Sequence, residues 1–371
     1  MTDGAITQKR TALIAVLEGA GYAMGDYPIL MEADSLLDLV GPHTRGRLFL
    51  TTGIGGREFC LRPEFTISIA RAHIRSGAAA RQARYGYCGP VFRKRPSGTG
   101  EFLQAGAESL GRTDRAEADA DMVLLAWEVC GALGVVPQTV FGDDALFKAV
   151  LASLDLPAVW HRRLQAAFGD RERLDAALAD LEAGASNPQA PLSGLGRLAP
   201  DTVAEIVGEM ISASATSVIA GRRVSDIAAR FADKSRLQDH GNGVAGAVAT
   251  VRDYLAIDCP IDQAVDRIRA FATAHGLDLS AELDGFSKRH ALIAARRDAP
   301  QDQRFQAGFG RQLDYYTGFT FDIFDAARAH AGPVCGGGRY DGLAERLGAE
   351  TAVPAVGFSL WLDRLLGEAA A

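Results

Sequence analysis

The chain has 371 residues, of which 48% are apolar and 23% charged, and its formal net charge is −7 at pH 7. This length and balance are typical of a soluble globular protein with a large core and more than one structural unit. No apolar run approaches the roughly 20 residues that cross a bilayer, and no signal-peptide pattern opens the chain. Membrane and secreted classes are therefore disfavoured, and the acidic charge mildly disfavours binding to nucleic acid.

The cysteines are odd in number, scattered, and without a C-x-x-C pair: Cys60, Cys88, Cys130, Cys259 and Cys335. This pattern indicates neither a disulfide framework nor a zinc site and favours a reducing cytoplasm. The seven histidines include no i, i+4 pair and no H-E-x-x-H motif, which favours surface or capping roles over metal ligation. We therefore expect no metal and no cofactor.

In chain order, the first part of the sequence alternates between helical and strand patterns. We expect a helix over 7–17, a strand over 22–30, a hairpin from 49–52 and 58–62, a helix from 63 to 75, and strands over 83–92 and 102–110. Pro28 inside the first strand indicates a sheet edge or a subunit boundary. Asp114 is a fair N-cap for a helix to about residue 133, with Glu117 three residues on.

The texture changes from residue 143 to about 299, where Ala, Leu, Asp and Arg recur at helical spacing and Asn187-Pro188 breaks the pattern. Strand patterns return at 304–309, 316–324 and 355–360, and short helices are expected from 343 and after 360. We therefore predict an α+β protein with a mostly antiparallel sheet. Its core consists of residues 1–142 and 300–371, interrupted by a helical insert over 143–299.

Two motifs in the first part place polar groups where they would be buried. Glu64 and Thr66 lie two residues apart where a strand meets a helix, and such a pair can hold an ammonium group. Alternatively, Glu64 only faces the helix dipole. Gln104 and Glu108 share one strand face. Glu108 would be costly there unless it met a cation from a substrate or a structural arginine, or unless the face is solvated.

The most informative stretch runs from Arg311 to Gly318, with one cation, one carboxylate and two adjacent phenols within six residues. The phenols Tyr315 and Tyr316 are typical of a binding site or of aromatic core in a sheet. A glycine-rich run over 335–343 follows. It lacks the features of a P-loop and of a dinucleotide fingerprint, so we expect a tight turn at residues 336–338.

These pieces occur in the order found in class II aminoacyl-tRNA synthetases, and the chain resembles the histidyl-tRNA synthetases over about residues 6–142 and 300–366. Residues 21–28, 92–108 and 357–365 are similar to motifs 1, 2 and 3, and residues 311–318 and 335–343 are similar to the two histidine signatures. The resemblance implies a class II synthetase-like antiparallel sheet flanked by helices. Since the chain ends soon after Arg364, we expect no anticodon-binding domain.

The resemblance implies that the histidine pocket of the family is retained. Glu64 and Thr66 match the family residues that bind the amino group, and Gln104 and Glu108 match residues of the pocket wall. Arg311 matches the arginine that contacts the carboxylate, and Tyr316 and Tyr340 match the phenols that surround the imidazole. Histidine offers an ammonium, a carboxylate and an imidazole, and this set offers acids, a guanidinium and phenols in return.

The nucleotide site departs from the family. No acid follows Arg93 within residues 92–96, where the family recognises the adenine amino group, and Trp361 stands where the family has glycine. An indole there would occupy space that the nucleotide needs, because only glycine lets backbone and ligand approach closely. Arg93 and Arg364 match residues that touch ATP phosphates, so residual nucleotide binding stays open.

Retained histidine residues and an altered nucleotide site together resemble the regulatory subunits of ATP phosphoribosyltransferase, a branch of this family. The resemblance implies a non-catalytic homodimer that assembles with a short catalytic subunit into a hetero-oligomer, activates it, and inhibits it when histidine binds. The main alternative is a truncated synthetase paralogue that forms histidyl-adenylate. An RNA-binding relative without chemistry is the third interpretation.

Overall fold

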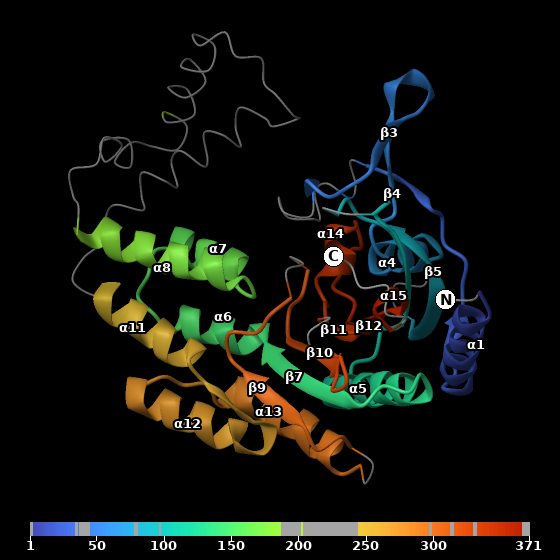
Figure 1. Ribbon diagram of the computed structural model, residues 1–371. Helices are drawn as coiled ribbons and strands as arrows, with labels where there is room; N and C mark the ends of the chain where they lie inside the picture. Colours follow the sequence, from blue (N-terminus) through green and yellow to red (C-terminus); the bar gives the residue numbers. More distant parts are fainter. Residues whose placement is uncertain are drawn as a thin grey trace. The chain divides into compact units, whose positions relative to one another are not determined.

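The computed structural model describes residues 3–33, 36, 45–77, 81–95, 98–186, 202, 244–296, 299–311, 315–328 and 332–365 (Figure 1). The chain divides into two compact units. The larger comprises Met1–Leu146, Ile257–Ala270 and Leu279–Ala371, and the smaller comprises Phe147–Ala256 and Phe271–Asp278. Residues 312–314 of the first histidine signature and the predicted break at 187–188 lie outside the described residues.

The larger unit is built on a mixed sheet whose described strands follow the order β1-β5-β6-β12-β11-β10-β7-β9-β8. The pairs β1–β5 and β7–β9 are parallel, and the other pairs are antiparallel. The strands are β1 (Ala23–Met24), β5 (Ala83–Phe92), β6 (Glu101–Leu110), β7 (Pro137–Asp143), β8 (Asp258–Pro260), β9 (Gln303–Gln306), β10 (Phe319–Asp325), β11 (Cys335–Arg339) and β12 (Ala355–Trp361).

A smaller antiparallel sheet has the order β2-β4-β3, with β2 (Leu30–Glu32), β3 (Leu50–Thr52) and β4 (Glu58–Leu61). A 3-10 turn, η1 (Ile54–Gly56), joins β3 to β4. The helices of the larger unit are α1 (Asp3–Gly19), α4 (Thr66–Arg75), α5 (Arg115–Ala132), α13 (Ser280–Ala294), α14 (Leu343–Arg346) and α15 (Leu362–Leu365), together with the 3-10 turn η3 (Ile261–Gln263).

The two faces of the large sheet carry different elements. On one face, Trp127 of α5 donates a hydrogen bond to Thr139 of β7 over 2.9 Å, and α13 packs beside α5. On the other face, Thr66 at the start of α4 donates to Glu108 of β6 over 2.7 Å. Because side chains alternate between the faces of a strand, neighbouring residues at one strand end serve opposite faces.

The smaller unit is helical. It contains α7 (Ala158–Ala167), α8 (Arg171–Ser186) and α11 (Val244–Leu255), and α6 (Asp144–Ala152) and α12 (Ala264–His275) contribute parts of their length. Aromatic rings form its core: Phe147 stacks on Phe168 at 4.3 Å, and Tyr254 lies 5.6 Å from Phe271. The described helices within the predicted insert 143–299 therefore divide between the two units, since residues 257–270 and those from 279 onward belong to the larger unit.

The fold class predicted from the sequence is confirmed, as are most of its elements, including α1, α4, β5, β6, α5, β10 and β12. The strand expected over 22–30 is instead divided between β1 at the edge of the large sheet and β2 in the small one, with Pro28 between them. Asp114 precedes α5 without a side-chain cap, because its carboxylate accepts hydrogen bonds from Arg112. No described helix is long and apolar enough to cross a bilayer.

The prediction of a tight turn at residues 336–338 is wrong. These glycines form the middle of β11, a buried strand between β10 and β12. β7 and β8 were also not foreseen. β11 can be buried because glycine has no side chain: a Cβ on Gly337 would lie 2.1 Å from the carbonyl oxygen of Gly357. Because glycine has no Cβ, β11 approaches its neighbouring strands more closely than a strand of β-branched residues could.

We expect Gly337→Ala to destabilise the protein by about 2 kcal/mol or more, since the added methyl meets backbone atoms of β12 that cannot move aside. Gly285→Ala is the matched control, because nothing lies within 4 Å of a Cβ at that position of α13 and alanine favours a helix. Thermal unfolding of both variants tests the expectation, and equal melting temperatures would contradict it.

Candidate functional site

A buried carboxyl group, that of Glu108 on β6, lies at the centre of the candidate site. It is 1% exposed and accepts hydrogen bonds from the hydroxyls of Thr66 and Tyr340. Burial raises the pKa of Glu108 to about 8, a shift that these two donors oppose and neighbouring Glu64 reinforces. Glu108 therefore keeps its proton at neutral pH, and no described arginine or lysine is paired with it.

Glu64 is the second buried acid and lies in the loop before α4. Its carboxylate accepts the backbone N–H groups of Thr66 over 2.7 Å and of Ile67 over 2.9 Å, which are free donors at the helix start. Burial raises the pKa of Glu64, while these hydrogen bonds and Arg93 oppose the rise. Glu64 therefore caps the start of α4. The same contacts also hold it beside Thr66 and Glu108.

Phenols surround the two acids. The ring of Tyr315 lies 5.0 Å from that of Tyr316 and 5.7 Å from that of Tyr340. Burial raises the pKa of Tyr316 to about 12, although nearby Arg311 lowers it, and the pKa of Tyr340 lies well above its ordinary value. The phenols that act electrostatically on Glu108, or feel its charge, are Tyr22, Tyr27, Tyr87, Tyr315, Tyr316 and Tyr340.

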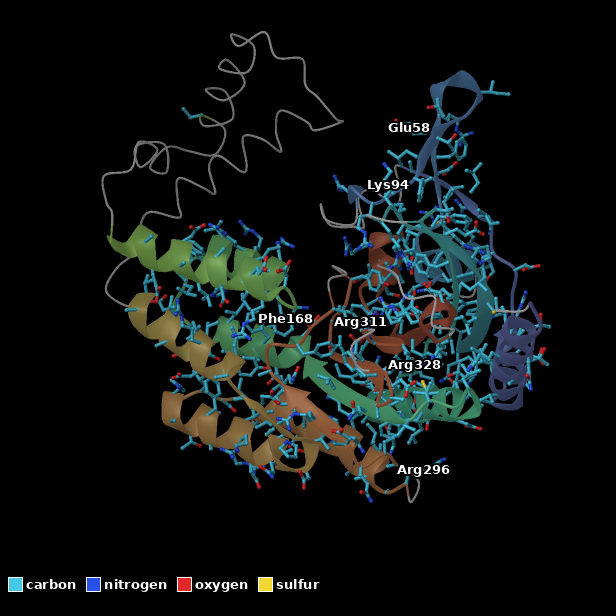
Figure 2. All side chains as sticks on the ribbon, in the orientation of Figure 1. Glu58, Lys94, Phe168, Arg296, Arg311 and Arg328 are labelled. Atoms are coloured by element: carbon cyan, nitrogen blue, oxygen red, sulfur yellow. The ribbon has the colours of Figure 1, made fainter. Side chains whose placement is uncertain are left out.

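Arg311, labelled in Figure 2, follows β9 and forms an ion pair with Asp322 of β10. The arginine side chain is 12% exposed, and its Nε atom has no hydrogen-bond partner among the described residues. Burial by itself lowers the pKa of Arg311, but Asp322 and the phenols of Tyr316 and Tyr315 raise it, so the guanidinium stays charged. One of its donors is therefore available to an added acceptor.

The acids and Arg311 lie over a surface of bare backbone. A Cβ on Gly357 would lie 1.7 Å from a carboxyl oxygen of Glu108, and one on Gly336 would lie 1.9 Å from Arg311. Glycine at both positions is thus required by close approach. Gln104 lies further along the same face of β6, and its side-chain oxygen is buried without a partner in the described part of the chain. Buried polar groups are usually hydrogen-bonded, so Gln104 adds an unused acceptor to this face.

The residues predicted for a nucleotide site have intrachain partners instead. Arg93 donates to the carbonyl of Pro63 over 2.8 Å, and burial lowers its pKa to about 10. Arg364 donates to the carbonyl of Pro333. The ring of Trp361 lies between two guanidinium groups, 4.6 Å from that of Arg364 and 5.5 Å from that of Arg311. These cation–π contacts fix the indole next to the Arg311 ion pair.

The structure thus brings together all seven residues predicted to bind histidine, and it places Trp361 at their edge. Sequence reasoning missed Asp322 and Tyr87 as members of this cluster, and it noted Tyr315 without assigning it a role in the pocket. Asp322 had a signal, because it is a carboxylate inside the apolar strand from Phe319 to Phe324. Tyr87 had none: its hydroxyl reaches Ser359 over 2.8 Å, across a separation of 272 residues.

Other sites on the described surface are less developed. No group of three or more His, Cys, Asp or Glu side chains in the described ranges is arranged to hold a metal ion. A surface pocket of about 200 Å³ lies elsewhere in the larger unit, between Tyr22, Arg84, Arg112 and Arg296, and contains none of the predicted site residues.

Comparison with known proteins defines the class to which this site belongs. A family model described as histidyl-tRNA synthetase matches residues 3–234 and 249–365. Two solved structures share the fold over nearly the whole chain. One is an ATP phosphoribosyltransferase regulatory subunit/histidyl-tRNA synthetase from Bacillus halodurans C, with a TM-score of 0.65 and 20% identity over 100% of this chain and 82% of that one. The other is a histidyl-tRNA synthetase from Nostoc sp. PCC 7120, with a TM-score of 0.64 and 15% identity over 98% and 71%.

Curated relatives are closer in sequence. A protein from Mesorhizobium japonicum is 44% identical over 345 residues, which are 91% of each chain, and one from Brucella ovis is 40% identical over 367 residues, which are 95% of each. Both are named ATP phosphoribosyltransferase regulatory subunit. The chain therefore belongs to the family of ATP phosphoribosyltransferase regulatory subunits, which share the fold of histidyl-tRNA synthetases.

We expect the stability of the protein to depend on pH through Glu108. The folded protein keeps this proton up to about pH 8, whereas the unfolded chain loses it near the ordinary value of 4.5. The folded state thus binds more protons between these values, and the free energy of unfolding falls as pH rises, by up to about 1.4 kcal/mol per pH unit. Urea unfolding from pH 5 to 8 measures this slope.

Glu108→Gln is the matched variant, because an amide keeps the shape of the protonated acid and cannot ionise. Its unfolding free energy should fall less steeply with pH than that of the wild type, because only the wild type has an ionisable group at position 108. Identical slopes would show that Glu108 is already ionised in the folded protein.

Proposed function

We propose that this chain is a non-catalytic histidine sensor that activates a short ATP phosphoribosyltransferase catalytic subunit and makes it sensitive to histidine. The observation that carries the proposal is the contrast between two neighbouring groups of residues. The predicted histidine residues leave hydrogen-bonding groups of Arg311 and Gln104 unused among the described residues. The predicted nucleotide residues, in contrast, are bound to the chain's own carbonyls and to Trp361.

The candidate pocket suits each charged part of histidine. The unused Nε donor of Arg311 suits the ligand carboxylate, as a charge-assisted hydrogen bond. Glu64 and Glu108 suit the ammonium group, because neither carboxyl group forms an ion pair with an arginine or lysine among the described residues. Tyr316 and Tyr340 have hydroxyls and rings that suit the imidazole. Binding of the ammonium would lower the pKa of Glu108 and release its proton.

Feedback control requires that histidine bind the inhibited assembly more tightly than the active one. A coupling of about 1–3 kcal/mol is typical of such regulation and is sufficient here. The name of the relatives, ATP phosphoribosyltransferase regulatory subunit, supports an assembly with a catalytic subunit. A homodimer within it is supported by the edge position of β1 and by the exposed side chains of Ile29 and Leu30 beside Pro28, which a second copy would cover.

The test combines this chain with a short-form catalytic subunit and follows ATP phosphoribosyltransferase activity through a histidine titration. We expect activation on mixing and its reversal by histidine. Arg311→Ala should still activate but should weaken histidine binding roughly 10- to 100-fold, since a charge-assisted hydrogen bond contributes about 1.5–3 kcal/mol. Calorimetry in buffers of different ionisation enthalpy gives the affinity and the protons released.

Two further variants control this experiment. Arg95→Ala removes an arginine whose partners are Asp363 and Phe102, so histidine binding should be unchanged. Arg311→Ala with Asp322→Asn avoids leaving a buried carboxylate unpaired and should bind histidine as weakly as the single variant. Wild-type affinity in the Arg311 variants would contradict the pocket assignment, and absence of any effect on the catalytic subunit would contradict the regulatory role.

The alternative function, formation of histidyl-adenylate by a synthetase paralogue, is favoured by the presence of Arg93 and Arg364. Histidine-dependent exchange of pyrophosphate into ATP separates the two functions. We expect no exchange by the wild type, because Trp361 fills space beside the pocket and holds Arg364. Steady pyrophosphate exchange by the wild type would contradict the sensor proposal and show that the protein is an enzyme. Trp361→Gly should be assayed in parallel, since it removes that obstacle.

A further inference from the structure

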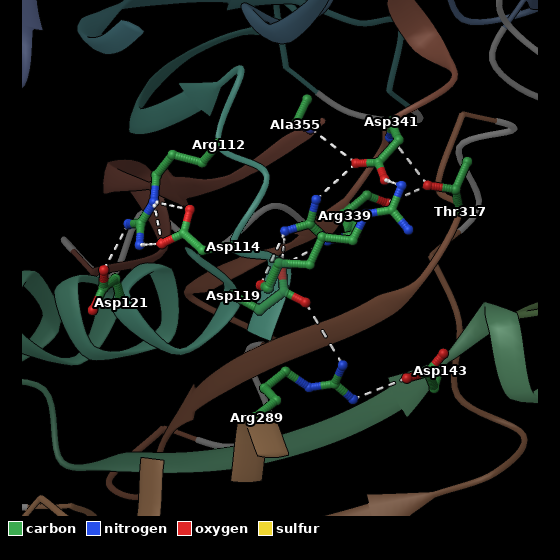
Figure 3. A network of polar contacts seen from close by, with 11 residues as sticks. Arg112, Asp114, Asp119, Asp121, Asp143, Arg289, Thr317, Arg339, Asp341 and Ala355 are labelled. Atoms are coloured by element: carbon green, nitrogen blue, oxygen red, sulfur yellow. Dashed lines mark hydrogen bonds and ion pairs between the residues drawn. The ribbon is translucent and has the colours of Figure 1, made fainter. Parts of the chain in front are cut away.

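A network of buried ions lies on the face of the sheet opposite the candidate pocket (Figure 3). Arg339 at the end of β11 donates to Asp119 of α5 over 2.8 Å. Arg289 of α13 lies 3.6 Å from the other oxygen of Asp119 and donates to Asp143 of β7 over 2.9 Å. These four side chains are 4–7% exposed. The network thus joins two strands and two helices through charge alone.

One end of the network holds the pocket. Arg339 and Tyr340 are adjacent, so their side chains point to opposite faces of the sheet, one to the ions and the other to Glu108. The backbone of Arg339 accepts the N–H of Thr317 over 2.8 Å, and its guanidinium donates to Asp341 over 2.7 Å. The N–H of Asp341 in turn donates to the Thr317 hydroxyl over 3.1 Å. Residues next to both pocket phenols, Tyr316 and Tyr340, are therefore tied to Arg339.

The other end of the network holds the start of α6. One oxygen of Asp143 pairs with Arg289, and the other accepts the backbone N–H groups of Ala145 over 3.0 Å and of Leu146 over 3.4 Å. These are first-turn amides, which have no partner within their own helix. The chain enters the smaller unit immediately afterwards, at Phe147. Any change in the hydrogen bonds between Asp143 and the first turn of α6 therefore acts at a point where the chain passes from one unit to the other.

Arg289 is the member of the network that is least completely bound. It is shared unequally between two acids, with a hydrogen bond to Asp143 and a longer ion pair to Asp119, and its Nε has no partner among the described residues. A guanidinium between two carboxylates has two alternative placements, one nearer each acid. An element with two discrete arrangements is what coupling between separate sites requires.

We propose that Arg289 is a positioning residue that couples the histidine pocket to the first turn of α6. The inference rests on the proposed histidine site. A ligand held by Tyr316 and Tyr340 fixes the position of the segments tied to Arg339. Arg339 then holds Asp119 in place, so that Arg289 pairs with Asp143 instead of Asp119. Asp143 then holds the first turn of α6 more firmly. Helix α13, in the predicted helical insert, thereby takes part in sensing.

Amide hydrogen exchange of the full chain, with and without saturating histidine, tests the proposal without a catalytic subunit. In the wild type, histidine should slow exchange at Ala145 and Leu146 at least tenfold. In Arg289→Met, histidine should still bind, within about tenfold of the wild-type affinity, but exchange at these two amides should slow less than threefold. Affinity and exchange are read on the same samples, and a purely structural defect would not separate them.

Arg112→Met is the matched control. Arg112 binds Asp114 and Asp121 at the start of α5, and its side chain is 14% exposed, but it forms no hydrogen bond or ion pair with the four described residues of the network. It should keep the full response. Asp143→Asn covers the case in which Arg289→Met fails to fold, because asparagine keeps an acceptor for the α6 amides and loses the charge that Arg289 recognises. It should lose the histidine response as Arg289→Met does.

The outcomes are distinct. Loss of the response in the Arg289 or Asp143 variant, with histidine still bound, supports the coupling. A full response in both variants overturns it, and so does a wild type that binds histidine without any change at α6. A wild type that binds no histidine overturns the proposed function, and this inference with it.

Discussion

The candidate site depends on the close approach of polar side chains to bare backbone. Gly336 and Gly357 leave room for Arg311 and for the carboxyl of Glu108, where any Cβ would lie within 2 Å of a charged or polar atom. Water is thereby excluded from both groups, which raises the pKa of Glu108 and strengthens the pairing of Arg311 with Asp322. Two acids, one ion pair and a set of phenols can thus share a small volume. A sheet built only of β-branched residues would fill that volume with apolar side chains.

The large sheet separates two polar systems of different character. The pocket face holds groups with unused hydrogen-bonding capacity, namely the Nε of Arg311 and the side-chain oxygen of Gln104. The far face holds Asp119, Asp143, Arg289 and Arg339 in mutual ion pairs. Buried ion pairs contribute little net stability compared with apolar side chains of similar size. Their value here is better sought in how they tie α5 and α13 to the strand end that carries Tyr340.

The residues predicted for a nucleotide site are bound within the chain, which fits the proposed use of a synthetase fold for regulation. Trp361 occupies the edge of the pocket through contacts with Arg311 and Arg364. Arg93 and Arg364 donate to carbonyls of the same chain. Groups that are satisfied within the protein gain less from an added phosphate, since an existing hydrogen bond must first be broken. In the proposed sensor, binding energy from histidine would then be available to shift the balance between conformations.

The sequence by itself determined the local elements and the residue types of the site. Apolar periodicity located α1, β5, β6 and α5, and the motif order led to Glu64, Thr66, Glu108, Arg311 and Tyr340. It did not determine β11, because three glycines carry no side-chain pattern and only their neighbours β10 and β12 make them a strand. Nor did it reveal that Arg289 would meet Asp143 across 146 residues, or Arg339 meet Asp119 across 220. Such pairs are decided by tertiary structure, because sheet register and helix packing, rather than local propensity, bring distant charges to one buried place.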